Sequence, residues 1–374
     1  MSYRDRVKAP GPKKLLALDG GGIRGVISLE VLRRLETILA ENLGKGDDFV
    51  LADYFDYIGG TSTGAVIAAG LSKGLRVEQL LDLYVERGED MFDKAALLRK
   101  FHYRYGVERL RGLLQEVLGK TTTFGDDELK TLLMMVLRNA TTDSPWPLSN
   151  NPNALYNDPA RQNNNLNIPL WQLVRASTAA PVYFPPEVVT VGDHDFVFVD
   201  GGLTMYNNPA FQLFLMATLD SYRLGWPATE SDLLLVSIGT GRSPKADDHL
   251  RPGDMNLLFN AGSVPAALMY AALNEQDLLC RVFGRCRYGA LIDRELGDLM
   301  QGPGVLKDRL FSYVRYNAEL SRSGLDDLGL TDVEPEDVQR LDSVQHIPDL
   351  RRVGQAVARD VAPEHFAGFL VAEA

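Results

Sequence analysis

The feature that most restricts the fold is a unit of strand, glycine turn and helix, which occurs twice near the N-terminus. In the first unit, the apolar run LLALD (15–19) meets GGGIRG, and a helix with leucines three and four residues apart follows. In the second unit, a short strand at 55–58 meets GGTSTG, and the small-residue segment AVIAAGLSKG follows. Two such units in succession predict parallel βαβ organisation.

Two later apolar runs extend this architecture. FVFVDGGL (196–203) and DLLLVSIGTG (232–241) both end in glycine turns, as buried central strands do. We therefore predict an α/β fold, a three-layer sandwich with a mainly parallel central sheet. Leucine spacing over about 76–140 predicts an inserted helical cap, and the Asn- and Pro-rich segment 149–169 predicts a long surface loop.

The expected domain organisation is one large unit with flanking segments. We expect an N-terminal tail over 1–12, a catalytic core over 13–245 that contains the cap, and a C-terminal helical region over 246–374. The last of these would complete or decorate the same domain. With 374 residues and 45% hydrophobic content, the chain is long enough to bury a sizeable core.

Charge and cysteine content exclude several classes of protein. A net charge of -11 argues against binding of a nucleic-acid polymer, which needs a basic face. The sequence has no run of about 18 apolar residues and no apolar signal core, so we expect a cytoplasmic protein, with peripheral contact to the inner membrane face as an extension. Cys280 and Cys286 match neither a metal site nor a disulfide framework, and we expect free thiols.

Ser62 lies at the centre of the second glycine turn, and two interpretations fit it. Gly60 and Gly64 flank it as GxSxG, the strained elbow that exposes a nucleophilic serine, where side chains at the glycine positions would clash across the turn. The helix that follows directs its N-terminal amides toward the same point. A plain βα turn capped by Ser or Thr is the alternative.

A nucleophilic serine needs a base, and the histidines are poorly placed to supply one. None of the five lies in a glycine turn at a strand end: His102, His194, His249, His346 and His365. Asp200 follows the apolar run FVFV, so its carboxylate should emerge at the sheet edge where the Ser62 turn opens, with its pKa raised by desolvation. An ordinary Asp-Gly turn formed with Gly201 and Gly202 is equally compatible with the spacing.

The first glycine turn also has two interpretations. Successive glycines at Gly20, Gly21 and Gly22 let backbone amides converge on an anion, which in acyl transfer is the tetrahedral oxyanion, and Arg24 adds a nearby positive charge. The same segment with Gly25 satisfies GxGxxG, a dinucleotide-binding pattern. Asp47 and Asp48 are at the right separation for its ribose-binding acid, but KGDD is typical of a loop rather than a strand end.

Taken together, DGGGIRG, GTSTG with the preceding Gly59 and the downstream DGG resemble the patatin-like phospholipases. RASTAAPVYFPP (175–186), DGGLTMYNNP and LLVSIGTG fit as well, and the resemblance covers roughly 13–245. It implies a patatin-like fold and a lipid acyl hydrolase with a Ser-Asp dyad, of phospholipase A or lysophospholipase type. Ser62 would be the nucleophile, Asp200 its general base, and Gly20, Gly21 and Gly22 would surround the oxyanion, with Arg24 in a supporting role.

The resemblance also implies partners and regulation. The substrate would be a phospholipid or other acyl lipid at a membrane surface, and no metal or cofactor is needed. Some bacterial relatives of similar length are antiviral effectors activated by a small nucleotide, so a regulated, membrane-degrading role is a further expectation. The basic segment 95–114 would be an amphipathic lid or an ordinary solvated helix pair. A nucleotide-binding protein using GGGIRG and a catalytically idle binding module remain the alternatives.

Overall fold

A single mixed sheet forms the centre of the molecule. The computed structural model describes residues 2–92, 103–181, 183–243, 257–301 and 305–370. Within these residues the sheet has nine strands: β1 (Lys13–Leu18), β2 (Tyr57–Thr61), β3 (Leu132–Asn139), β4 (Ser144–Ser149), β5 (Glu187–Val191), β6 (His194–Asp200), β7 (Leu233–Ile238), β8 (Arg285–Tyr288) and β9 (Ser312–Tyr316).

The strands are paired in the order β5-β6-β3-β2-β1-β7-β9-β8, with β4 attached to β3. All pairings from β3 through β2, β1, β7 and β9 to β8 are parallel. The pairings that involve β4, β5 and β6 are antiparallel. The predicted α/β class with a mainly parallel central sheet is therefore confirmed. β1 and β7 are buried along their whole length, as strands covered on both faces should be, although β1 begins with two buried lysines.

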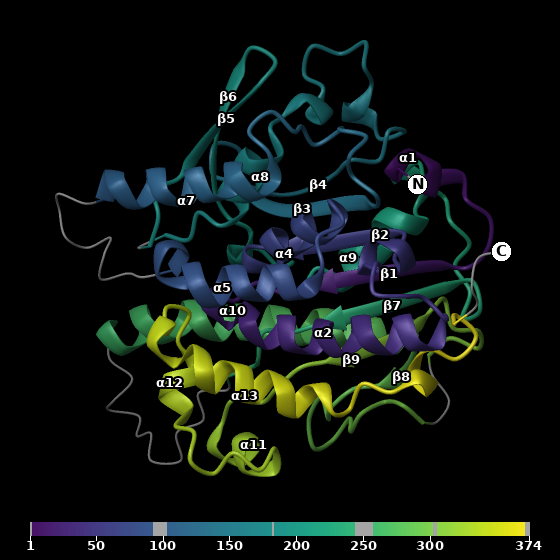
Figure 1. The fold of residues 1–374 in the computed structure, drawn as a ribbon, viewed down its shortest axis with the longest axis vertical. Helices are drawn as coiled ribbons and strands as arrows, with labels where there is room; N and C mark the ends of the chain where they lie inside the picture. The colour runs from purple at the N-terminus through teal and green to yellow at the C-terminus, as the bar shows by residue number, and fades with distance from the viewer. Residues whose placement is uncertain (1, 93–102, 182, 244–256, 302–304, 371–374) are drawn as a thin grey trace.

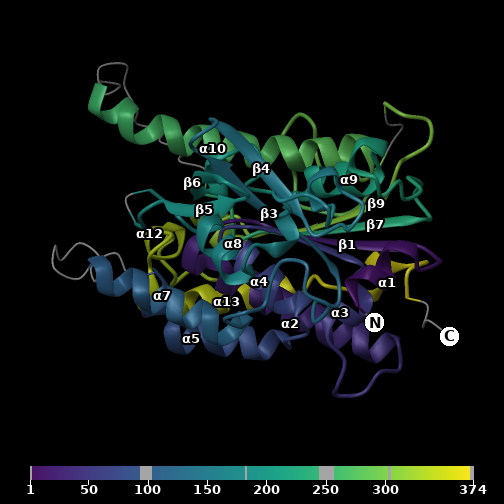
Figure 2. The same cartoon turned by 90° about the horizontal axis from the view of Figure 1, so that it is seen from above.

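Helices cover both faces of this sheet, as the two views in Figures 1 and 2 show. One face carries α9 (Ala210–Thr218) and α10 (Leu257–Phe283). The other carries the longer helices α2 (Gly25–Asn42), α4 (Thr63–Ser72), α5 (Val77–Phe92), α7 (Tyr103–Leu118), α8 (Leu170–Ser177) and α13 (Ile347–Ala358). The remaining α-helices of the described residues are short: α1 (Tyr3–Lys8), α3 (Leu51–Tyr54), α11 (Arg322–Asp327) and α12 (Pro335–Gln339).

The first residues are not a tail, contrary to the prediction for 1–12. They form α1, which packs against the start of the sheet with Tyr3 fully buried. Arg6 is also buried and forms an ion pair with Asp56, the residue before β2, at 3.4 Å. A charged segment is ordered here because the sheet supplies a buried carboxylate for its guanidinium.

Two regions that were predicted to be helical contain strands of the sheet. In the predicted cap, α5 and α7 are helical, but 132–139 form β3 at the centre of the sheet. In the C-terminal region, β8 and β9 extend the sheet beyond β7. The mainly helical prediction for 76–140 and the helical prediction beyond 245 therefore missed these strands. A short apolar run has no periodicity that separates a strand from a buried helix.

The region around the Asn-rich loop also differs from expectation. β6 is antiparallel and only partly buried, whereas FVFVD predicted a buried central strand. The loop itself is present, but several of its asparagines are buried. Asn150 accepts the backbone N–H of Leu133 at 2.7 Å, and Asn157 donates to the carbonyl of Ser149 at 2.7 Å. These side chains satisfy buried backbone groups where the regular ladder ends.

Candidate active site

Ser62 lies at the tight turn between β2 and α4. Its backbone has φ +53° and ψ -122°, a left-handed conformation that is strained for a residue with a side chain. Because Ser62 is the N-cap residue of α4, the free N–H groups of the first helical turn lie next to it. The backbone of Ser62 therefore has the strained geometry that the GxSxG pattern predicts.

The flanking glycines are required by close backbone packing. A Cβ atom on Gly60 would lie 2.1 Å from the carbonyl oxygen of Gly64. A Cβ atom on Gly64 would lie 2.2 Å from the carbonyl oxygen of Leu18, at the end of β1. These contacts confirm the predicted clash across the turn, and they show that the neighbouring strand contributes to it.

Asp200 reaches Ser62 by a different route from the one expected. β4 and β2 occupy opposite edges of β3, since both pair with residues 134–136. β6 pairs with 137–139 opposite β4, so it continues along the edge that β2 occupies. Thr61 is opposite Val136 and Asp200 is opposite Leu137, so the antiparallel β6 ends where β2 ends. The two side chains meet through this end-to-end arrangement and not through neighbouring parallel strands.

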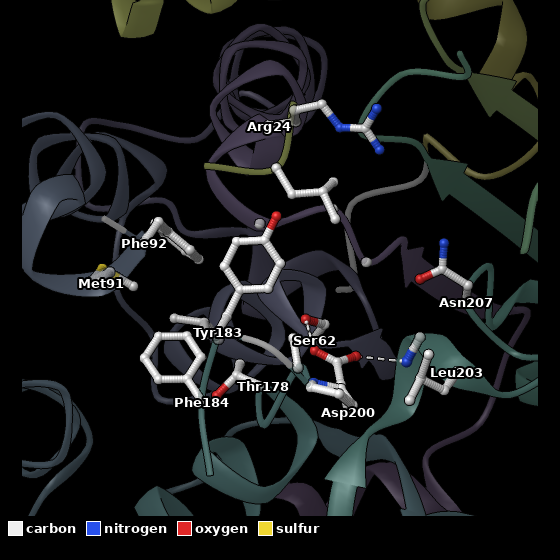
Figure 3. Close-up of a pocket in the computed structure, with 18 of the residues that line it drawn as sticks. Arg24, Ser62, Met91, Phe92, Thr178, Tyr183, Phe184, Asp200, Leu203 and Asn207 are labelled. Carbon is white, nitrogen blue, oxygen red and sulfur yellow. Dashed lines mark hydrogen bonds between the residues drawn. The ribbon is translucent and has the colours of Figure 1, made fainter. Parts of the chain in front are cut away.

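The hydroxyl and the carboxylate are in direct contact. Ser62 Oγ donates a hydrogen bond to Asp200 Oδ2 at 2.7 Å, and the backbone N–H of Gly202 donates to Asp200 Oδ1 at 2.7 Å. Figure 3 shows both bonds. Burial raises the pKa of Asp200 to about 6, although the hydrogen bonds from Ser62 and Gly202 act to lower it. A carboxylate of this kind is a stronger base than an exposed aspartate and is still ionised at neutral pH.

The two glycines of the DGG motif have different roles. Gly202 binds the carboxylate of Asp200 through its backbone N–H, and Gly201 is required for steric reasons. A Cβ atom on Gly201 would lie 2.1 Å from the carbonyl oxygen of Val136. This close approach lets the chain turn from β6 directly over β3. The two interpretations of Asp200, a residue of an Asp-Gly turn and a general base, are therefore compatible.

Ser177 is a neighbour that the sequence reasoning gave no role. Its Oγ accepts the backbone N–H of Ser62 at 2.9 Å and donates to the carbonyl of Val136 at 2.7 Å. Ser177 is the last residue of α8 and is fully buried. The hydroxyl links the strained elbow to β3. The only feature of the sequence that pointed to Ser177 is that its segment, RASTAAP, fits the family resemblance.

The first glycine turn lies beside Ser62, and its amides differ in their partners. The N–H of Gly20 donates to the carbonyl of Asn207 at 3.0 Å, so this amide is already engaged. The N–H groups of Gly21 and Gly22 have no acceptor among the described residues. Both residues line the same cavity as Ser62. Two of the three predicted amides are thus available to an anion.

The Cβ side of the same loop packs closely against the C-terminal part of the chain. A Cβ atom on Gly21 would lie 2.1 Å from Oγ1 of Thr240, and one on Gly22 would lie 2.3 Å from the carbonyl oxygen of Leu341. Packing against the protein itself therefore accounts for these two glycines, without a bound dinucleotide. Asp47 and Asp48 lie in an exposed turn, away from any strand end.

Gly25 and Arg24 have packing roles that the sequence did not indicate. A Cβ atom on Gly25 would lie 2.6 Å from Oγ1 of Thr63, so this glycine lets α2 start close to α4. Arg24 lines the cavity, but its guanidinium donates to Ser243 Oγ at 3.0 Å and to the carbonyl of Gln339 at 3.3 Å. Figure 3 shows it directed away from the Ser62–Asp200 pair. Burial lowers the pKa of Arg24 to about 10.

A cavity of about 240 Å³ opens over the Ser62–Asp200 pair. Its walls are mostly apolar and come from several parts of the chain: Met91 and Phe92 at the end of α5, Leu110 of α7, Phe184 after α8, Leu203 after β6, and Met269 of α10. The helical cap thus contributes directly to the site. The candidate lid at 95–114 lies partly outside the described residues, and only its C-terminal part can be placed in α7.

The histidines that the structure describes lie away from Ser62 or have other partners. His194 is exposed on the β5–β6 hairpin, His346 contacts Asp337 and Asp349, and His365 contacts the hydroxyl of Tyr316. His102 and His249 lie outside the described residues. In the part of the chain that the structure describes, no group of three or more His, Cys, Asp or Glu side chains is arranged to hold a metal ion. Cys280 and Cys286 are free and buried.

Part of the chain is similar in sequence to proteins named as phospholipases and patatins. A cGAMP-activated phospholipase of Escherichia coli (strain TW11681) is 29% identical over 234 residues, covering 61% of this chain and 62% of that protein. Patatin-17 of Solanum cardiophyllum is 29% identical over 252 residues, covering 62% of this chain and 61% of that protein. The match thus spans less than two thirds of the length of these relatives. A crystal structure of VipD from Legionella pneumophila is a weak structural match, with a TM-score of 0.39 at 15% identity over 92% of this chain and 67% of that one.

Over the described residues, none of the helices combines the length and the apolar character needed to cross a bilayer.

The sequence model of the patatin-like phospholipase family matches residues 16–214, more than half of the chain. This range contains the glycine turn before α2, the GTSTG turn and the DGG turn. The chain therefore belongs to the patatin-like phospholipase family.

Proposed function

We propose that this protein is a serine acyl hydrolase that cleaves carboxylic ester bonds of lipids through an acyl-Ser62 intermediate. The observation that carries the proposal is the hydrogen bond of 2.7 Å from Ser62 Oγ to Asp200 Oδ2. A hydroxyl in contact with a buried carboxylate of raised pKa is the arrangement that general-base activation of a nucleophile requires. Family membership supports the same chemistry.

The mechanism uses one carboxylate in both directions. Asp200 accepts the proton of Ser62 as Oγ attacks the ester carbonyl, and the N–H groups of Gly21 and Gly22 stabilise the oxyanion. Asp200 then transfers the proton to the leaving alcohol, which leaves Ser62 acylated. Water, deprotonated by the same carboxylate, hydrolyses the acyl-enzyme and regenerates Ser62.

The walls of the cavity favour an acyl lipid as the substrate. Met91, Phe92 and Leu110 form an apolar surface beside the reacting hydroxyl, suited to an acyl chain. We infer a phospholipid or lysophospholipid because the family and the relatives are phospholipases.

A fluorophosphonate probe tests the proposal, because it reacts covalently with an activated serine, and Ser62→Ala shows whether Ser62 is the residue labelled. The wild type should be labelled and should hydrolyse a short-chain chromogenic ester. Ser62→Ala and Asp200→Asn should lose both activities while their thermal unfolding stays cooperative. An unlabelled, inactive wild type would favour a catalytically idle binding module. Nucleotide co-purifying with an unlabelled protein would favour a nucleotide-binding function.

Regulation by a small nucleotide is a second proposal, and the relatives motivate it. The Escherichia coli relative is described as a cGAMP-activated phospholipase. We infer that a cyclic nucleotide activates this protein also, and that its role is that of a regulated effector acting on membranes. Hydrolysis of phospholipid vesicles should rise when cyclic dinucleotides or trinucleotides are added. Unchanged activity would exclude the compounds tried.

A further inference from the structure

The glycine loop is held by the C-terminal part of the chain. Asp19, the residue before Gly20, forms a two-point ion pair with Arg315 of β9, with N–O distances of 2.8 and 2.5 Å. The side chains are 0% and 2% exposed, respectively. Arg315 also donates to Ser237 Oγ at 2.6 Å, on the intervening strand β7. Arg315 lies outside residues 16–214, the range that the family model matches.

This ion pair lies directly before the two available amides of the loop. The N–H groups of Gly21 and Gly22, which have no acceptor among the described residues, are only two and three residues beyond Asp19. Glycine is free to adopt many backbone conformations, so three in succession do not fix the direction of their own amides. The direction must be set from the ends of the loop.

Both ends of the loop are in fact fixed. At the first end, the bidentate pair fixes the carboxylate of Asp19, and Thr240 Oγ1 donates to the carbonyl of Gly20 at 2.7 Å. At the other end, the N–H of Ile23 donates to the carbonyl of Leu341 at 3.0 Å. Thr240, Leu341 and Arg315 all come after residue 214. Besides the bond from the N–H of Gly20 to the carbonyl of Asn207, the contacts on both sides of the two available amides therefore come from the C-terminal part of the chain.

We propose that Arg315 is a positioning residue that orients the Gly21 and Gly22 amides toward the oxyanion through Asp19. The inference rests on the proposed hydrolase function. Stability alone does not account for such a pair, because a buried ion pair often gives no more stability than apolar residues of the same volume. A planar guanidinium that binds both carboxylate oxygens does, however, fix orientation as well as position.

The experiment compares Arg315→Met and Arg315→Lys with a matched control. The control is the pair of Arg6 with Asp56. This pair is also buried, but it lies at the other end of the central strands, where β2 begins. Arg6→Met therefore removes a buried Arg–Asp pair without touching the glycine loop. For each variant, the rate constant of fluorophosphonate labelling and the kcat and KM for a short-chain ester are measured on the folded fraction.

Arg315→Met should label about 10- to 100-fold more slowly than the wild type, since a displacement of about 1 Å can cost about 100-fold. The change should appear in kcat, with KM for the short ester unchanged. Arg315→Lys, which keeps the charge but not the two-point geometry, should recover part of the rate. Arg6→Met should label at the wild-type rate once corrected for its folded fraction.

Two results would overturn the inference. Arg315→Met labelling at the wild-type rate would show that the pair does not position the loop, and an equal loss in Arg6→Met would show that any buried pair has this effect. If Arg315→Met does not fold, Arg315→Lys and Ser237→Ala decide the question by the same rate constant. Failure of the proposed function is a separate outcome, because the wild type itself would then not be labelled at Ser62.

Discussion

At Asp200, burial and hydrogen bonding act in opposite directions on one carboxylate. Burial is the larger effect and places its pKa at about 6. If Asp200 is the general base, kcat/KM for a soluble ester should rise as the pH increases through about 6 and level off above it, since only the ionised form accepts a proton. A pH–rate profile between pH 4.5 and 8.5 measures this. An inflection near the ordinary aspartate value, or no inflection, would contradict the assignment.

The same carboxylate should make the folded protein less stable at high pH. Its folded pKa is above the unfolded value of 3.8, so its stabilising contribution is complete below pH 3.8 and is lost as the pH rises through about 6. At pH 8 the difference amounts to about 3 kcal/mol. Asp200→Asn should therefore increase the free energy of unfolding at pH 8, by at most this amount, and the increase should shrink toward pH 4.

Urea unfolding at several pH values measures this effect, and Asp48→Asn, in an exposed turn, controls for the change in net charge. A stabilised but inactive Asp200→Asn is the expected combination, because active sites keep groups that cost stability. Equal or lower stability of Asp200→Asn at pH 8 would mean that the carboxylate is better solvated than its burial suggests.

Single residues of the site could be predicted from the sequence only where a local pattern carries the geometry. Ser62 with Gly60 and Gly64 is such a pattern, since the clash that requires glycine lies within a few residues. Ser177 and Arg315 could not be found in this way, because their contacts depend on how α8 and β9 meet the turns. Arg24 was expected to add a positive charge beside the first glycine turn; it lines the cavity over Ser62, but its direction depends on Ser243 and Gln339, which are distant in sequence.

Among the elements, the junction of β2 and α4 tolerates the least change. Gly64→Ala places a Cβ atom 2.2 Å from the backbone of Leu18, and a strand cannot move as a flexible side chain can. We expect a loss of about 1–3 kcal/mol or more in the free energy of unfolding, together with loss of labelling at Ser62. Gly112→Ala in α7 is the matched control, because no atom lies within 4 Å of its added Cβ.

Gly112→Ala should instead stabilise the protein by about 1 kcal/mol, through helix propensity alone. Thermal or urea unfolding of both variants gives the comparison, with fluorophosphonate labelling as the functional readout. A Gly64→Ala protein with wild-type stability would mean that the packing of α4 against the end of β1 is looser than the structure shows.

The sequence predicted best those elements in which an apolar run and a glycine turn occur together. β1, β2 and β7 are apolar runs that end in glycine turns, and α2 and α4 follow such turns. β8 and β9 have neither signal, since RCRY and SYVRY are short and carry arginines. Arg315 is tolerated in a fully buried strand only because Asp19 pairs with it. β3 is apolar but continues a leucine-rich region, so its type is decided by its strand neighbours and not by its own pattern.

At the scale of the whole molecule, the core expected at 13–245 depends on residues far beyond it. Residues 312–316 of β9 pair with β7, and the side chains of both strands are buried. A fragment ending at 245 would expose the edge of β7 to water or to other chains. It would also lack Arg315, which leaves the carboxylate of Asp19 buried without its partner. An unpaired buried charge costs several kcal/mol, a large part of the stability of a domain.

We therefore expect the fragment 13–245 to aggregate or to unfold without cooperativity, whereas residues 2–370 fold and react at Ser62. Circular dichroism melts and fluorophosphonate labelling of the two proteins make the comparison. Adding the fragment 257–370 in trans should restore labelling if β8 and β9 can still join the sheet. A cooperative melt and wild-type labelling of 13–245 alone would contradict the expectation. It would mean that the glycine loop reaches its working geometry without Arg315, so this result would also count against the positioning role proposed above.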